Sequence, residues 1–247
     1  MARNLQVGET VYVSRARLGL GANAPSAFLQ AEVMDLQDRS VRVKLPDGTW
    51  SDGVATSAVH RNIGVLILRI GDFATETTLL DPLAKSVLQY FRLLLSDDMV
   101  CLCRCRSMEE LKHFWQQLHG AYSHVVIIGH GKQSAIQFGV NGWLTAQSII
   151  EILESSNPGP KSFLSLCCKT GYAAFAKPFS QSSICDSLIA PFHSVHGAVA
   201  SQFCQTYFAH HLLSGDTVRV AFTHSRTAIP GGTHFRLWQK GNVTGDE

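Results

Sequence analysis

The chain has 247 residues, of which 45% are hydrophobic and 16% are charged, and its formal net charge is +2. This composition is typical of a globular protein with a large core and excludes a disordered chain. A charge this close to balance does not indicate a nucleic-acid surface, so we expect no nucleic-acid partner. The longest apolar run, 63–68, is far shorter than the roughly 20 residues that a membrane span needs, so we expect no membrane insertion.

The seven cysteines have no regular spacing, and the first residues lack the charged, apolar and small-residue regions of a secretory signal. Unpaired thiols are typical of proteins in a reducing compartment. We therefore expect a cytoplasmic protein.

Residues 1–62 show the pattern of a small β-barrel. Apolar and polar residues alternate over 5–13, 31–36 and 41–45, and turn residues separate these runs. Several short strands within about 60 residues favour a curled barrel. The opening Gly8-Glu9-x-Val and the hairpin Asp47-Gly48-Thr49-Trp50 resemble Tudor-type barrels. We expect this segment to act in regulation or partner binding.

From residue 63 onward, strand and helix patterns alternate. Five apolar strands, each followed by a helix, predict a mostly parallel sheet flanked by helices, which is an α/β fold. We assign 63–247 to this second domain. The expected strands are 63–70, 99–105, 125–128, 162–167 and 197–201, with a short strand at 135–138. The expected helices are 79–95, 107–119, 145–154, 183–191, 205–213 and 217–228.

Two of the expected strands end on reactive side chains that glycines follow. The strand at 125–128 leads into Gly129-His130-Gly131, and the strand at 162–167 leads into Cys168-Lys169-Thr170-Gly171. Thiolate chemistry needs a cysteine, an imidazole to take its proton, and small residues that leave backbone N–H groups facing the oxyanion. Ligands bind beyond the carboxyl ends of parallel strands. The sequence therefore predicts a cysteine peptidase with a His130–Cys168 dyad.

Residues 63–228 resemble the caspase-like CHAT proteases, relatives of caspases, metacaspases and separases. The resemblance rests on the His-Gly after one strand, the glycine-containing hairpin at 139–145 and the motif Cys168-Lys169-Thr170-Gly171. The run 199–203 is similar to the family's strand ending in Ser-x-Trp, and the helix before Gly215 is similar to its closing helix. Phe203 replaces the usual tryptophan, and the acidic residue that follows it in the family is absent.

The resemblance implies a role for each matched residue. His130 is general base and acid, Cys168 is the nucleophile, and the backbone N–H groups of Gly131 and Cys168 form the oxyanion hole. The implied activity is that of an endopeptidase that cuts a protein partner without a cofactor. Such proteins are regulated effectors in cell-death or defence pathways, under the control of an activating protein or ligand. The alternative is a catalytically silent CHAT-like scaffold that binds a peptide.

The family also implies which residues line the substrate pocket. The residue two before the nucleophile is Leu166, and Ser201 and Gln202 are expected at the far wall. A charged side chain entering a pocket floored by leucine would lose hydration without gaining a partner. We therefore expect cleavage after an uncharged, apolar residue. Asp72 or Glu76 reaching into the pocket would reverse this preference.

Other cysteines and histidines are weaker candidates for site residues. Cys167 is the rival nucleophile, but alternation along the strand turns it to the other face, and a vicinal disulfide would be strained. Cys101, Cys103 and Cys105 share one strand face, which suits core packing better than a metal, so we expect no metal site. The remaining histidines are expected at the surface or at helix caps: His113, His119, His124, His193, His196, His210, His211, His224 and His234.

Overall fold

The computed structural model describes residues 5–20 and 26–244. In these ranges the N-terminal part forms a five-stranded antiparallel sheet with the strand order β4-β3-β2-β1-β5. Its strands are β1 (Thr10–Ser14), β2 (Phe28–Leu36), β3 (Ser40–Lys44), β4 (Trp50–Ala55) and β5 (Val59–His60).

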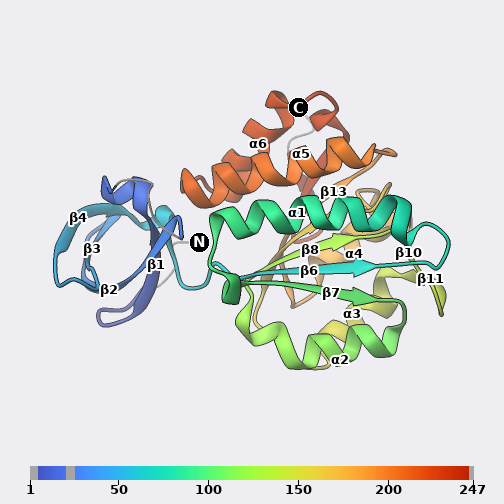
Figure 1. Ribbon diagram of the computed structural model, residues 1–247, viewed down its shortest axis with the longest axis horizontal. Helices are drawn as coiled ribbons and strands as arrows, with labels where there is room; N and C mark the ends of the chain where they lie inside the picture. Colours follow the sequence, from blue (N-terminus) through green and yellow to red (C-terminus); the bar gives the residue numbers. More distant parts are fainter. Residues whose placement is uncertain (1–4, 21–25, 245–247) are drawn as a thin grey trace.

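The N-terminal sheet encloses a small apolar core of its own. Because strand residues alternate between faces, Val11, Val13, Val33, Val41 and Val43 all point inward and are fully buried. The sheet curls around this core (Figure 1). A strand lies in each of the three predicted runs, although β1 begins only at Thr10, and closure into a barrel of the Tudor type stays a prediction.

Within the described residues, the larger sheet has seven strands in the order β15-β14-β13-β12-β8-β6-β7. The run from β7 to β13 is parallel, and β14 and β15 pair antiparallel at one side. The central, mostly parallel sheet that the sequence predicted is confirmed. The strands are β6 (Val65–Ile70), β7 (Val100–Cys105), β8 (His124–Ile128), β12 (Lys161–Ser165), β13 (Cys185–Pro191), β14 (Phe235–Gln239) and β15 (Asn242–Thr244).

Helices cover both faces of the larger sheet (Figure 1). Alternate strand residues enter the two cores, as Leu66 and Leu68 face one layer while Val65 and Ile67 face the other. One layer holds α1 (Asp81–Leu94), α5 (Gly197–Phe208) and α6 (Val218–Ala228). The other holds α2 (Met108–Leu118), α3 (Ala146–Glu154) and α4 (Ala173–Gln181).

Short elements complete the chain. A hairpin sheet beyond β8 is formed by β9 (Gly131–Lys132), β10 (Ala135–Phe138) and β11 (Gly142–Thr145). Two π-helical turns adjoin long helices, with η3 (Glu76–Leu80) leading into α1 and η6 (Ala209–Leu213) extending α5. The remaining turns are η1 (Arg15–Leu18), η2 (Thr56–Ala58), η4 (Asp97–Met99), η5 (His119–Ala121) and η7 (Gly232–His234).

Two predicted elements were wrong. The segment 183–191 was expected to be helical but contains strand β13, and 197–201 was expected to be a strand but begins helix α5. Residues of β13 are buried on both faces between β12 and β14, so their apolar run carries no alternation that would mark a strand. Helix α4 also occupies a segment where a loop was expected.

The N-terminal sheet contacts the larger sheet's helical layer directly. Phe28 of β2 is 4% exposed and belongs to the core under α1 and α5. Ser14 donates a hydrogen bond of 3.2 Å to the carbonyl of Leu213, and the amide of Ala27 donates one of 3.2 Å to Leu94. Figure 1 shows the strands β6 and β7 pointing away from the N-terminal sheet. The predicted boundary between 62 and 63 stays a prediction.

Among the described helices, none combines the length and the apolar character that crossing a bilayer requires.

Candidate active site

His130 and Cys168 emerge from the same edge of the larger sheet. His130 follows β8 and Cys168 follows β12, and these strands are parallel neighbours with Ile127 opposite Ser165. Because parallel strands place their carboxyl ends together, the two side chains start from adjacent positions. This edge is the one where ligands bind in open α/β sheets.

Gly131 packs directly against the backbone that carries Cys168. A β-carbon at Gly131 would collide with the carbonyl oxygen of Cys168 and would lie 2.9 Å from Cys167 Cβ. A side chain therefore has no room at Gly131 unless the backbone shifts. The close approach brings the residue after His130 onto the loop after β12.

The loop after β12 turns sharply around Cys168. Lys169 has a φ of +63°, in the left-handed region that non-glycine residues rarely occupy and that costs on the order of 1–3 kcal/mol. The fully buried Thr170 fixes the turn, because its hydroxyl donates to the carbonyl of Cys167 at 2.8 Å. Gly171 is tied to β13 through a hydrogen bond of 2.8 Å to Pro191. The strained turn is typical of a functional position.

The Cys168 thiol lies against the segment that joins β13 to α5. The backbone N–H of Val195 donates to Sγ at 3.5 Å, and Sγ lies 3.8 Å from the carbonyl oxygen of the same residue. Among the described residues, no hydrogen bond joins this sulfur to His130. Sequence reasoning missed Val195 because the strand and helix around it were assigned in the wrong order.

The His130 imidazole is held by the loop that follows β6. Its Nε2 lies 2.5 Å from Thr75 Oγ1 and 3.7 Å from Asp72 Oδ2. Thr75 Oγ1 donates to Asp72 Oδ1 at 2.9 Å, so the same hydroxyl oxygen is free to accept a hydrogen bond from the Nε2–H group of His130. This arrangement favours the tautomer with the hydrogen on Nε2 and a free lone pair on Nδ1.

Asp72 is kept ionised by the same loop. The backbone N–H of Thr75 lowers the pKa of its carboxyl, with further contributions from the Thr75 hydroxyl, the charge of His130 and the amide of Ala74. An ionised carboxylate beside His130 stabilises the imidazolium that forms when the ring takes a proton. Sequence reasoning named Asp72 only as a modifier of the pocket. The sequence did offer a signal that Asp72 lies near His130: it follows Gly71 directly after β6, and β6 ends beside β8.

Glu76 is engaged in a buried ion-pair network. Arg69, which is 1% exposed, lies 2.9 Å from Glu76 and 3.1 Å from Asp81, and Arg106 lies 2.6 Å from Glu76. The hydrogen bond from Arg106, helped by Arg69, lowers the pKa of Glu76 to about 2. Glu76 thus forms ion pairs with both Arg69 and Arg106 and is not free to enter a substrate pocket.

The three expected pocket residues do not form an open wall. Leu166 is 3% exposed and packs into the core under α1 and α5. Ser201 is buried on α5 with its Oγ 2.8 Å from Ser86 Oγ of α1, while Gln202 is exposed. Ser201 and Gln202 lie inside a helix rather than at a strand end, because the strand expected there is α5.

The other cysteines are mostly inaccessible. All seven lie in the described part of the chain and are free, and Cys101 and Cys168 are partly exposed while the rest are buried. Burial raises the pKa of Cys167 to about 12 and that of Cys105 to about 12. Cys167 faces the core opposite Cys168, with its sulfur 3.8 Å from the Ile127 carbonyl.

Several histidines lie where the sequence did not place them. His124 and His211 are 3% and 5% exposed, so the expectation of a surface or capping position was wrong for both. His196 does cap α5, because its Nδ1 accepts from the amide of Ala198 at 3.2 Å. Among the described residues, the group that could hold a metal ion is His210, Asp216 and His224, away from Cys168.

No family model matches the chain, and no curated protein matches it. Solved structures are similar in fold. The secreted C11 cysteine protease "iotapain" from Bacteroides thetaiotaomicron is 9% identical with a TM-score of 0.54, over 72% of this chain and 67% of that chain. The structure of a secreted C11 cysteine protease from the same organism with an irreversible peptide inhibitor is 10% identical, with a TM-score of 0.51, over 72% and 66%.

Caspase-1 from Spodoptera frugiperda is 12% identical over 67% of this chain and 77% of that chain, with a TM-score of 0.45. The chain spans about two thirds of the C11 protease chains that it matches, 66% and 67%. The likeness to the C11 proteases shows that this chain has their α/β fold.

Proposed function

We propose that the chain is a cysteine endopeptidase in which Cys168 is the nucleophile and His130 is the general base. The observation that carries the proposal is that the strands before these residues are parallel neighbours ending at one sheet edge, with Gly131 packed on the backbone of Cys168. The fold shared with C11 cysteine proteases supports it.

The reaction follows from the chemistry of the two side chains. His130 Nδ1 takes the thiol proton, and Cys168 Sγ attacks the scissile carbonyl carbon to give a tetrahedral oxyanion. The backbone N–H groups of Gly131 and Cys168 donate to that oxyanion. The C–N bond then breaks as His130 returns the proton to the leaving amine. Water, deprotonated by His130, hydrolyses the thioester and releases the second product.

The substrate is a protein partner, cut after an uncharged and apolar residue. Glu76 is held by two arginines, and Asp72 is held by Thr75. No carboxylate of this loop is therefore available to recognise a basic side chain. We propose that activity is regulated by an activating protein or ligand, in a cell-death or defence pathway. Residues 1–62 serve partner choice.

A silent scaffold is the second candidate. Two observations favour it: Sγ of Cys168 accepts a hydrogen bond from Val195 and has none with His130, and the N-terminal sheet carries a depression of about 260 Å³. That depression could receive a peptide. It is lined by Thr10, Gln30, Ala31, Glu32, Lys44, Leu45 and Pro46.

Thiol reactivity separates the two candidates. With iodoacetamide at pH 6, we expect Cys168 to be alkylated at least tenfold faster than Cys101, the other partly exposed thiol, because an imidazole that takes the thiol proton increases the thiolate fraction. The His130→Ala variant should lose this difference. Peptide mapping by mass spectrometry reads both sites in one sample. Equal rates for Cys101 and Cys168, with or without any activator, favour the scaffold.

A further inference from the structure

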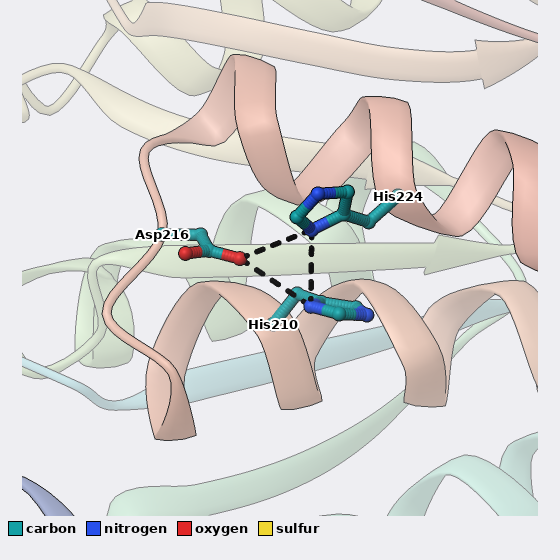
Figure 2. A group of neighbouring side chains, drawn as sticks. All are labelled: His210, Asp216 and His224. Carbon is teal, nitrogen blue, oxygen red and sulfur yellow. Dashed lines mark hydrogen bonds and ion pairs between the residues drawn. The ribbon is translucent and has the colours of Figure 1, made fainter.

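Three potential metal ligands converge beyond the end of α5 that is farther from Cys168. They are Nδ1 of His210 in η6, Oδ2 of Asp216 in the next loop and Nδ1 of His224 in α6 (Figure 2). Each nitrogen lies 3.3 Å from the Asp216 oxygen, and the two nitrogens lie 3.4 Å apart. Side chains from three separate elements therefore point at one place.

The size of this triangle matches a tetrahedral ion. Zn²⁺ binds imidazole nitrogen at about 2.0–2.1 Å in tetrahedral geometry, which sets neighbouring ligand atoms about 3.3–3.4 Å apart. An octahedral Mg²⁺ with ligands at about 2.0–2.1 Å would set them about 2.9 Å apart and prefers oxygen ligands. The observed distances and the two nitrogens both favour zinc.

Without a metal ion, hydrogen bonds alone do not pair the two Nδ1 atoms and the Asp216 oxygen well. If both imidazoles carry their hydrogen on Nδ1, both donate to the same oxygen of Asp216, and the two hydrogens converge there with their nitrogens only 3.4 Å apart. If only one ring does so, the other presents a lone pair to the carboxylate. A divalent cation accepts a lone pair from each atom and removes both conflicts.

The loop that carries Asp216 is fixed by its own backbone. The amide of Asp216 donates to the carbonyl of His210 at 3.1 Å, and Nδ1 of His211 lies 2.8 Å from the carbonyl oxygen of Asp216. Such outer contacts hold metal ligands in place before the ion binds. The side chains of His210, Asp216 and His224 are 34%, 21% and 51% exposed, so the site opens to solvent on one side.

We propose that His210, Asp216 and His224 bind one Zn²⁺ ion, with water as the fourth ligand, and that the ion ties α6 to the end of α5. The 12 residues of α5 span about 18 Å and separate this site from Val195 and Cys168. The ion therefore lies too far from Cys168 to take part in the thiol chemistry. Gly215, next to Asp216, packs on Ala58 of η2 in the N-terminal part, so zinc binding should also stabilise that contact.

Metal titration of the full chain tests the site directly. EDTA-treated protein, kept reduced, is titrated with Co²⁺ and then with Zn²⁺. We expect one equivalent of Co²⁺ to give the intense visible d–d absorption of a tetrahedral site, and Zn²⁺ to abolish that absorption and to raise Tm. The His224→Ala and Asp216→Asn variants should bind about tenfold more weakly or worse. Circular dichroism verifies their folding.

The matched control is His113→Ala, which removes an exposed histidine of α2 far from the cluster in sequence. It should bind Co²⁺ and respond to Zn²⁺ as the unmodified chain does. The proposal is overturned if the His210→Ala/His224→Ala double variant still binds one equivalent with the same absorption, or if the unmodified chain shows no saturable binding. Neither result bears on the reactivity of Cys168.

Discussion

The short loop after β6 determines which nitrogen of the His130 ring carries the hydrogen. Asp72 Oδ1 accepts hydrogen bonds from Ala74 N, Thr75 N and Thr75 Oγ1 at 3.0, 2.6 and 2.9 Å, which fixes both side chains. His130 Nε2 in turn lies 2.5 Å from the Thr75 hydroxyl oxygen, within hydrogen-bond distance. In the proposed mechanism, Thr75 and Asp72 are therefore positioning residues that leave His130 Nδ1 to exchange the proton with Cys168.

Replacing the hydroxyl of Thr75 should impair turnover without unfolding the protein. The Thr75→Val variant keeps the side-chain shape but leaves His130 Nε2 without its acceptor. We expect kcat to fall about 10- to 100-fold with little change in KM, because the loss affects proton transfer and not substrate binding. The measurement is steady-state cleavage of a peptide substrate together with Tm.

Two variants make this result specific. Thr75→Ser restores the hydroxyl and should restore most of kcat, and Thr77→Val changes an exposed neighbour and should have no effect. A Thr75→Ser enzyme as slow as Thr75→Val would mean that the threonine methyl group, rather than the hydrogen bond, matters.

The sequence was informative about His130 and Cys168 because each follows a buried apolar strand. The sequence did not predict the contacts of Thr75 and Val195, since both residues lie in connecting segments that carry no periodic pattern. Their roles arise only from the strand order, which puts the loop after β6 beside β8 and the loop after β13 beside β12. Leu166 was predicted to line the substrate pocket because it lies two residues before Cys168, but its side chain is in the core.

The loop that holds His130 is itself anchored by η3. Glu76 in this turn pairs with the buried Arg69 of β6 and with Arg106 after β7, so three elements meet at one carboxylate. The side chain of Glu76 is 9% exposed. A partner for a buried guanidinium is costly to lose, because the charge left behind is not hydrated.

Stability should depend on the charge of Glu76 in a defined pH window. Its pKa is lowered from 4.5 to about 2, so its contribution is complete above pH 4.5 and is lost as the pH falls toward 2. At about 1.4 kcal/mol per pH unit this contribution is at most about 3 kcal/mol. We expect Glu76→Gln to lose about that much at pH 7 and to differ little from the unmodified chain near pH 2.

Urea unfolding at pH 7, 4.5 and 3 measures this difference, and Glu151→Gln on the exposed face of α3 is the matched control. A Glu76→Gln penalty that is the same at all three pH values would show that packing, rather than charge, is lost.

The order of elements was predictable up to β12 and less so beyond it. Helix α2 is capped by Ser107, whose Oγ accepts from the amide of Glu110 while the side chain of Glu110 accepts from the Ser107 amide, as the local sequence indicates. By contrast, β13 and α5 are both apolar over most of their length, and periodicity alone does not distinguish a doubly buried strand from a buried helix. The antiparallel partner β14 then gives β13 its strand conformation.

The two sheets of the molecule share an apolar contact that the sequence did not reveal. The composition change near residue 62 indicates a boundary, and β5 ends at His60 while β6 starts at Val65. Nevertheless, the ring of His60 lies 5.9 Å from that of His211, and Phe28 packs with the helices α1 and α5. Such tertiary contacts depend on how loops pack and leave no local pattern in the sequence.

This shared contact predicts that the two parts unfold together. Phe28→Ala removes a buried ring at the junction and should cost about 3–5 kcal/mol. Because the ring lies in the core under α1, the loss should lower hydrogen-exchange protection in β6 and α1 as well as in β2 and β3. Hydrogen–deuterium exchange with mass spectrometry resolves these peptides separately.

Leu36→Ala is the matched control, since Leu36 is 43% exposed on the same strand β2 and should change protection in neither part. If Phe28→Ala weakened β2 and β3 alone, the two parts would be independent folding units. Residues 63–247 should then fold and react at Cys168 without the N-terminal sheet. Loss of protection in both parts would instead mean that removing 1–62 exposes the apolar surface that Phe28 covers, and that the shortened chain is unstable for that reason.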